Sequence, residues 1–353
     1  LIDGNGAYAA ILLDGVSYWK VKGLRICNHS SERCVRQGIC ISAKSEGITA
    51  GIEIYDCEIF EVDGENRRAM PVYQSMYWNG AVYVTFPGRT SAQDHLHDVV
   101  ISNNYIHDVR TSGIRVNQQE DFINDIHHTH VVVRGNRIER TGSDGIIVAN
   151  CISPLIDSNV CFDAGALGTL EDTQLIAGIW VCATRDALIQ RNEVARTRMF
   201  ENDGTAFDTH WGTAGTTVFQ YNYSHDNEGG FWLDCMKLNH NRDCEKTILR
   251  YNISMRDGRG IAVYDQGILT EWYGNLFFHE KPIQICCFDE GENFHFDHNV
   301  FCIPQETDWQ KARYEENIVN DSQWLELIQY ETQNPNWRDH VTEKLCKFVG
   351  VTR

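Results

Sequence analysis

The stretch Val131-Val132-Val133-Arg134-Gly135-Asn136, followed by Gly145-Ile146-Ile147-Val148, decides the fold, because variants of it recur along most of the chain. Each unit holds a short apolar run that ends in Asn and a second short run that is usually opened by Gly. The Asn residues are Asn104, Asn136, Asn159, Asn192, Asn222, Asn252, Asn275 and Asn299, and the glycines are Gly113, Gly145, Gly178, Gly204, Gly230 and Gly260. The hydrophobic period is 2 and helical stripes are missing, which predicts short strands.

The spacing of these Asn residues indicates a solenoid. Consecutive Asn residues lie 32, 23, 33, 30, 30, 23 and 24 residues apart, so one turn is a unit of about 23 residues with occasional longer loops. We expect each Asn to be a stacked turn residue whose amide bonds to the Asn above and the Asn below. That role is structural and carries no chemistry.

This pattern resembles that of right-handed parallel β-helix proteins of the pectate-lyase-like superfamily, over roughly residues 10–303. The resemblance implies an all-β chain with a right-handed parallel β-helix over residues 1–304 and a short helical C-terminal cap over residues 305–353. We expect this cap to cover the exposed end of the solenoid, because such stacks need covered ends. The chain opens at Leu1 in a strand-like run, so we expect the N-terminal cap to be missing and another domain or chain to complete that end.

The composition disfavours several classes of function. The chain has 353 residues and a formal net charge of -18, which argues against nucleic acid and against anionic polymers as partners. It has no stretch of 18 apolar residues, so we expect no membrane span. Its 13 Cys residues are odd in number and scattered without a CxxC pair, which favours free thiols and a cytoplasmic location and leaves a secreted protein as the alternative.

The Gly-opened strands predict which side chains face outward. The first and third residues after Gly are apolar and belong in the core, so the second and fourth point outward. By this count Asp208 and Asp234 are both fourth, on consecutive turns, and their carboxyls would stand about 4.8 Å apart. Such closeness raises one pKa, and glycoside cleavage requires a protonated acid beside a carboxylate. We therefore predict a glycoside hydrolase in which Asp208 protonates the leaving oxygen and Asp234 attacks the anomeric carbon or activates water, with retention slightly favoured.

Aromatic and polar residues around this pair predict a sugar-binding floor. Trp180 and Trp232 take the outward second position, and exposed rings beside paired acids suit sugar stacking. The other candidates for substrate binding are Trp211, Tyr264, His210, Asp203, Glu171, Asp172 and Glu228. The polar members of this set are equally explained as turn residues or solvated groups.

The segment Gly230-Phe231-Trp232-Leu233-Asp234 resembles the strand of the β-helix β-xylosidase family that presents the nucleophilic Asp. The resemblance implies Asp234 as nucleophile of a retaining enzyme, with the acid/base one turn later in the same register. That position is Tyr264 here, with Asp265 beside it, so the acid/base is either Asp208 or Asp265. β-Helix lacto-N-biosidases are a second similar group that uses two Asp residues.

Three other functions stay open. Polysaccharide lyases and epimerases of this fold use Lys or Arg as base, usually with Ca²⁺, but Arg115 lies several turns from the Asp pair. A β-helix can also be a non-catalytic carbohydrate-binding shaft. The stretches His95-Leu96-His97-Asp98 and 125–130 could supply metal ligands, although loop histidines are the simpler interpretation. We expect a carbohydrate substrate, no cofactor and no metal.

Overall fold

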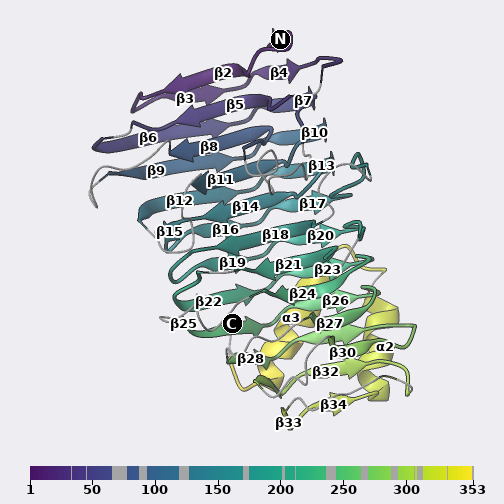
Figure 1. The fold of residues 1–353 in the computed structure, drawn as a ribbon. Helices are drawn as coiled ribbons and strands as arrows, with labels where there is room; N and C mark the ends of the chain where they lie inside the picture. The colour runs from purple at the N-terminus through teal and green to yellow at the C-terminus, as the bar shows by residue number, and fades with distance from the viewer. Residues whose placement is uncertain are drawn as a thin grey trace.

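The structure is a computed structural model and describes residues 1–32, 34–44, 46–65, 78–86, 94–118, 127–169, 175–200, 203–210, 212–235, 244–263, 269–287, 293–305, 307, 313–331 and 333–351. Three parallel sheets run the length of a β-helix, and the chain visits them in turn, one coil after another (Figure 1). The predicted parallel β-helix is therefore confirmed.

Sheets A and B form two of the three walls. Over the described residues, sheet A consists of β1 (Ile2–Asp3), β4 (Arg25–Asn28), β7 (Glu58–Val62), β10 (Tyr105–Val109), β13 (Arg137–Thr141), β17 (Val160–Phe162), β20 (Glu193–Ala195), β23 (Tyr223–His225), β26 (Ile253–Met255), β29 (Leu276–Phe278), β32 (Val300–Cys302) and β34 (Ile318–Val319). Sheet B consists of β2 (Ala9–Asp14), β5 (Gln37–Ser42), β8 (Val82–Phe86), β11 (Ile114–Gln118), β14 (Ile146–Ala149), β18 (Ala177–Cys182), β21 (Thr205–Thr209), β24 (Gly230–Asp234), β27 (Gly260–Val263) and β30 (Gln284–Cys287).

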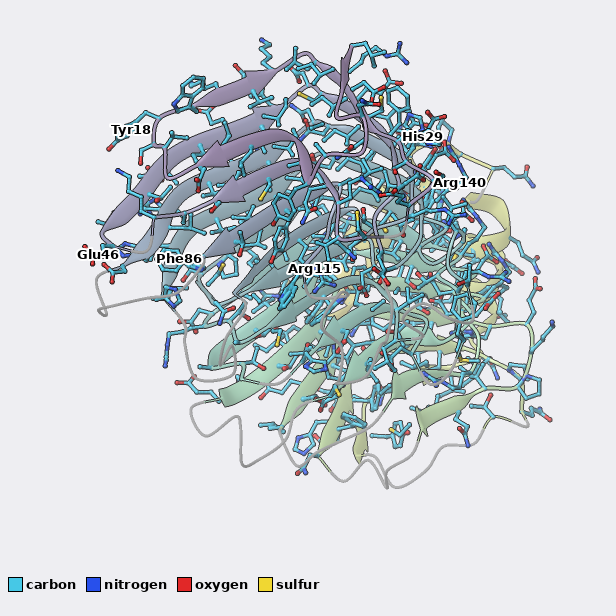
Figure 2. All side chains as sticks on the ribbon, turned by 45° about the horizontal axis from the view of Figure 1, so that its top comes forward. Tyr18, His29, Glu46, Phe86, Arg115 and Arg140 are labelled. Carbon is cyan, nitrogen blue, oxygen red and sulfur yellow. The ribbon has the colours of Figure 1, made fainter. Side chains whose placement is uncertain are left out.

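Sheet C is the third wall. Within the described ranges it consists of β3 (Lys20–Lys22), β6 (Ile48–Tyr55), β9 (His95–Ser102), β12 (His128–Arg134), β16 (Leu155–Asp157), β19 (Leu188–Gln190), β22 (Gly215–Gln220), β25 (Cys244–Arg250), β28 (Thr270–Tyr273), β31 (Phe294–Asp297) and β33 (Arg313–Glu315), with β15 (Cys151–Ile152) paired to β12 alone. Figure 2, which views the coil from another angle, shows Tyr18 and Glu46 on one side, His29 and Arg140 on the other, and Arg115 between them.

The predicted Asn ladder is confirmed, and it forms the corner between sheets C and A. The Nδ2 of Asn192 donates to Oδ1 of Asn222 over 3.0 Å, and the Nδ2 of Asn222 donates to Oδ1 of Asn252 over 3.0 Å. The same bonds connect the rungs from Asn104 to Asn317. The residue before each rung from Asn104 to Asn299 is left-handed, with φ between 49° and 64°, and this conformation turns the chain sharply.

The next corner, between sheets A and B, carries paired charges. Three Asp–Arg pairs bridge consecutive coils through two hydrogen bonds each, at 2.7–2.9 Å, and all six residues are left-handed, with φ between 53° and 58°. We call this set the charged corner; its residues are Asp108, Arg140, Asp163, Arg196, Asp226 and Arg256.

The core inside the coil changes along the axis. The earlier coils are filled mainly by Ile and Val, and the later coils by rings. The rings of the later coils are Phe207, Phe219, Phe231, Trp232, Trp272, Phe277, Phe294, Phe296 and Phe301. They pack at edge and stacked angles, for example Trp232 against Trp272 at 5.4 Å between centroids.

The tail departs from the prediction in two ways. Strands β33 and β34 pair with β31 and β32, so paired strands of the coil continue to Val319, past residue 304, where the sequence places the end of the β-helix. Helices α2 (Ser322–Glu331) and α3 (Trp337–Phe348) then pack against the outer face of sheet A, where Trp324 and Leu345 join Ile253 and Val300 in a second apolar cluster (Figure 1). They cover a side of the later coils, which the prediction of an end cap missed.

Of the 13 cysteines, the 11 whose side chains the structure describes are free thiols, and most of these are buried. Over the same ranges, no helix has the length and the apolar character that crossing a membrane requires.

Candidate functional site

The outer face of sheet B carries the described part of the predicted site. Strand pairing puts Asp208 of β21 between Trp180 of β18 and Leu233 of β24. The same column continues through Ile147 to Arg115 on earlier coils, and Figure 2 marks Arg115. Ile147 and Trp180 form a small apolar cluster separate from the main core, so this column points outward, as predicted for Asp208 and Trp180.

Asp234 does not share the register of Asp208. It pairs with Thr209, in a column that continues through Val181 to Val148 of the core. Because side chains alternate along a strand, this register assigns Asp234 to the opposite side of sheet B from Asp208. The prediction that the two carboxyls stand side by side in one register is therefore wrong.

The error has its origin in the glycines. Gly178 stands in a column that continues as Ala206 and then Phe231, as the neighbouring pairs show. Gly204 instead lies just before β21 and Gly230 is the first residue of β24, with φ of 87° and 119°. Gly204 precedes the column by two positions and Gly230 by one position. Counting from glycine therefore starts at a different place in each of these strands.

Trp232 is a core residue, which corrects its prediction as an outward substrate contact. It pairs with Phe207, is fully buried and packs among the rings of the later coils. Its indole Nε1 donates to Oγ1 of Thr209 over 3.2 Å. The ring is therefore committed to packing inside the coil.

Asp208 is a buried acid on the outer face. Its side chain is 3% exposed, and its Oδ1 has no hydrogen-bond partner among the residues that the structure describes. Burial raises the pKa of Asp208 well above its ordinary value, and the charges of Asp203, Asp234 and Asp144 raise it further. This carboxyl therefore keeps its proton at pH values where an exposed Asp is ionised.

Asp144 organises the neighbouring coil and was missed by the sequence analysis. Its Oδ1 accepts from the indole Nε1 of Trp180 over 2.9 Å and from the backbone of Ala177 over 3.0 Å. Its Oδ2 accepts from Ser143 over 3.1 Å and lies 3.4 Å from Nη2 of Arg115. The signal that could have found it is the Asp-Gly pair that opens β14, which Asp203 and Gly204 repeat before β21.

His210 and Cys182 extend the outer face. The Nδ1 of His210 lies 3.8 Å from Sγ of Cys182, and the His210 ring lies 5.3 Å from that of Trp180. Burial raises the pKa of the Cys182 thiol, and the charge of Asp208 adds to that rise, which disfavours a reactive thiolate here. Trp180 itself is only 9% exposed, so it offers less open surface than the prediction of an exposed stacking ring implies.

The remaining predicted residues divide into two groups. Glu228 is exposed at a turn, where it accepts from the backbone of Met199 over 2.8 Å and pairs with Arg198 over 2.8 Å, so its contacts are those of a turn residue. Asp203 is half-buried beside Gly204. Five predicted residues lie outside the described residues: Trp211, Tyr264, Asp265, Glu171 and Asp172.

In this arrangement Asp208 can donate a proton, and the carboxylates close to it can stabilise positive charge on a bound sugar. A neutral carboxylic acid held in a buried position is the form that a general acid needs at neutral pH. Carboxylates close to it, such as Asp203, can stabilise the positive charge that develops on a sugar ring when its glycosidic bond breaks.

No known family model matches this sequence. A lacto-N-biosidase of Bifidobacterium longum subsp. longum is 26% identical over 314 residues, which cover 78% of this chain and 19% of that protein. The chain thus spans about a fifth of the length of this curated relative.

Solved structures of a lacto-N-biosidase share the fold of this chain. The native GH136 lacto-N-biosidase of Eubacterium ramulus superposes with a TM-score of 0.59 at 22% identity, over 88% of this chain and 51% of that chain. Its selenomethionine derivative gives a TM-score of 0.60 at 20% identity, over 88% and 50% of the two chains. The shared fold confirms the predicted resemblance to β-helix carbohydrate-active enzymes.

Proposed function

We propose that this protein is a glycoside hydrolase that cleaves a glycosidic bond in an oligo- or polysaccharide, with Asp208 as its general acid. The observation that carries the proposal is the buried Asp208 carboxyl on the outer face of a β-helix. Its pKa is raised, and its Oδ1 has no partner in the described part of the chain. The likeness to proteins named lacto-N-biosidase supports the same class of reaction.

In the proposed reaction, Asp208 gives its proton to the glycosidic oxygen while the bond to the anomeric carbon breaks. In a retaining reaction a second carboxylate attacks that carbon as the bond breaks, and water deprotonated by Asp208 then releases the sugar from it. In an inverting reaction the second carboxylate instead activates the water that attacks the carbon. Asp203 and Asp234 are the candidates, because both charges act on the pKa of Asp208. We favour Asp203, since it is half-buried at the start of β21, whereas Asp234 is fully buried in the register of the core.

A panel of p-nitrophenyl glycosides that includes the lacto-N-bioside tests the activity. We expect p-nitrophenol release from at least one member, with the lacto-N-bioside as the first candidate because of the names of the relatives. An unsaturated product that absorbs in the near ultraviolet would establish a lyase instead. Retained ligand without turnover would establish a carbohydrate-binding protein.

Proton NMR of the first product formed tests the stereochemical course. We expect retention, the course in which the two carboxyls stand about 5 Å apart, because the charge of Asp203 acts on the pKa of Asp208. An inverted first product would contradict this part of the proposal and leave acid catalysis by Asp208 standing.

Two matched variants identify the second carboxylate. We expect Asp203→Asn to lower kcat by about 10²-fold or more with folding intact, which is the scale of losing a positioned catalytic group. We expect Asp234→Asn to act mainly on the melting temperature, because its register belongs to the core side of sheet B. Loss of turnover in a well-folded Asp234→Asn protein, with an active Asp203→Asn protein, would reverse the assignment.

A further inference from the structure

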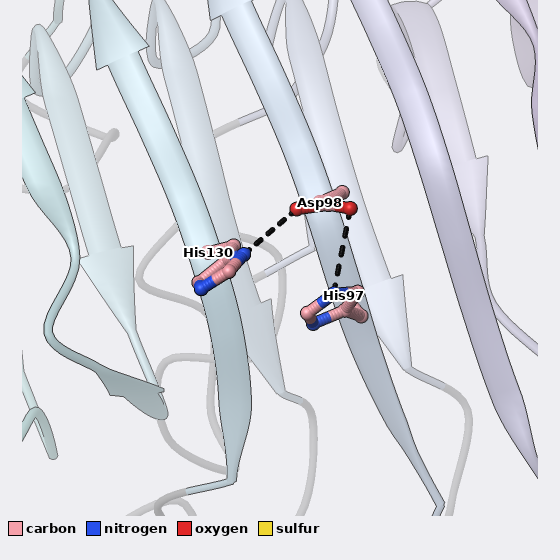
Figure 3. Close-up of side chains that lie close together, drawn as sticks. All are labelled: His97, Asp98 and His130. Atoms are coloured by element: carbon pink, nitrogen blue, oxygen red, sulfur yellow. Dashed lines mark hydrogen bonds and ion pairs between the residues drawn. The ribbon is translucent and has the colours of Figure 1, made fainter.

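Two histidines and an aspartate converge on the outside of sheet C, on a different sheet from the proposed active site. Among the described residues, His97, Asp98 and His130 bring one possible ligand atom each within 4.8 Å of one another (Figure 3). The sequence favours loop histidines here, but His97 and Asp98 lie on β9 and His130 lies on the adjacent strand β12.

The fold itself brings these side chains together. His97 pairs with Thr129, so Asp98 and His130 follow at the same level of consecutive coils. Both have left-handed backbones, with φ of 53° and 54°, and this places both at the same sharp bend of the coil. In Figure 3 the three side chains point toward one another from the two strands.

The hydrogen bonds orient the rings for ligation. The Nδ1 of His97 lies 2.8 Å from Oγ1 of Thr129, which leaves its Nε2 directed at Asp98, 3.4 Å from Oδ2. The Nδ1 of His130 lies 2.9 Å from Oδ1 of Asp98. A ligating imidazole commonly bonds through its other nitrogen to a fixed polar group, and Thr129 is placed to serve His97 in this way.

The donor set determines which ions suit the cluster. Two imidazole nitrogens and a carboxylate favour divalent transition metals such as Zn²⁺, while Ca²⁺ and Mg²⁺ prefer oxygen ligands throughout. The side chains of His97, Asp98 and His130 are 37%, 54% and 71% exposed, so an ion can enter directly from solvent.

We propose that His97, Asp98 and His130 bind one divalent transition-metal ion of the zinc class, with water in the remaining coordination position. The ion would take the place of the direct contacts between the two rings and the Asp98 carboxyl. It would also connect β9 to β12 and so fasten two consecutive coils together.

Equilibrium dialysis of the metal-stripped full chain against Zn²⁺, read by elemental analysis, tests this proposal. We expect His97→Ala and His130→Ala each to bind one equivalent less than the wild type, since Zn²⁺ held by Cys thiols elsewhere is common to all variants. The matched control is His298→Ala, which removes an imidazole held between Asp297 at 2.7 Å and Glu316 at 2.9 Å. Among the described residues this group has no second histidine that completes a metal-ligating set, so the variant should bind as the wild type does. Equal uptake by the wild type and both ligand variants would overturn the site.

A second pair of measurements separates ligation from simple charge pairing. In Cu²⁺-loaded protein, electron paramagnetic resonance should show nitrogen couplings that disappear in His130→Ala, and their persistence in that variant would count against the site. Thr129→Val, which keeps the shape and removes the hydroxyl, should weaken Zn²⁺ binding by about 10-fold. Unchanged affinity in Thr129→Val would contradict the orienting role of Thr129.

Discussion

The charged corner and the outer face of sheet B treat their acids in opposite ways, although they belong to the same coils. At the corner, hydrogen bonds from Arg140 hold the pKa of Asp108 down at about 2. On sheet B, burial raises the pKa of Asp208, whose Oδ1 finds no partner within the described ranges. Buried polar groups are nearly always satisfied. An acid oxygen without a partner among the described residues, in a fold that pairs the acids of its charged corner, therefore points to function at the expense of stability.

The largest expected effect is on turnover, and it separates the two regions directly. Asp208→Asn should lower kcat by about 10³-fold, because the amide cannot donate a carboxylic proton to the leaving oxygen. The matched change at the charged corner, Asp108→Asn, should leave kcat near that of the wild type. Kinetics on the best glycoside of the panel measure both, and equal losses in the two variants would remove the distinction between the regions.

The second effect is on stability, and it comes from breaking the hydrogen-bonded Asn ladder between sheets C and A. Asn222→Ala removes the Oδ1 that accepts two bonds from Asn192 and the Nδ2 that donates to Asn252. Stranding these buried groups should lower the free energy of unfolding by about 3 kcal/mol, as measured by chemical denaturation.

Its control is Asn317→Ala at the last rung, where the side chain is only half-buried and water can replace the lost bonds to Asn299. We expect a loss of about 1 kcal/mol there. Similar losses at Asn222 and Asn317 would show that burial does not set the strength of the ladder.

The third effect concerns the stability cost of the buried acid. The folded state raises the pKa of Asp208, so between the unfolded and folded pKa values the native protein binds more protons, and stability falls as pH rises. Asp208→Asn should therefore unfold at a higher temperature than the wild type at pH 7. Its free energy of unfolding should be higher by about 1–2 kcal/mol. Calorimetry should show this advantage shrink toward pH 4, and an advantage independent of pH would contradict the buried proton.

The smallest effect is the stability contribution of Asp108, and its pH dependence has the opposite sign to that of Asp208. The pKa of Asp108 is depressed, so its contribution is complete above the ordinary Asp value near 4 and is lost as pH falls toward about 2. Its side chain and that of Arg140 are 41% and 39% exposed, which limits the contribution to about 0.5 kcal/mol. Denaturation of Asp108→Asn should match the wild type below pH 2 and differ slightly at pH 6.

Much of the architecture could be predicted because it repeats. The Asn ladder is written into the sequence as a recurring residue at a recurring place, and its hydrogen bonds follow from stacking alone. The site could be predicted only in part. Asp208 and Trp180 face outward as expected, whereas Asp234 and Trp232 do not, because Gly204 and Gly230 have positive φ and stand at different distances from the same column of sheet B.

Backbone conformation was the information that the sequence lacked. A glycine in an extended strand and a glycine in a left-handed turn look the same in one sequence, yet they shift the alternation of every residue after them. The role of Asp144 was hidden for a related reason, since its bonds to Trp180 and Arg115 join coils whose alignment was not yet known.

The ring-filled later half of the core has a spectroscopic consequence. The fully buried indoles Trp232 and Trp272 sit in those coils, while of the described tryptophans in the first third of the chain Trp19 is 54% exposed and Trp78 is half-buried. Intrinsic emission will therefore follow mainly the melting of the distal half. Partial unravelling that starts at the amino-terminal coils would pass nearly unseen by fluorescence, and circular dichroism would detect it first.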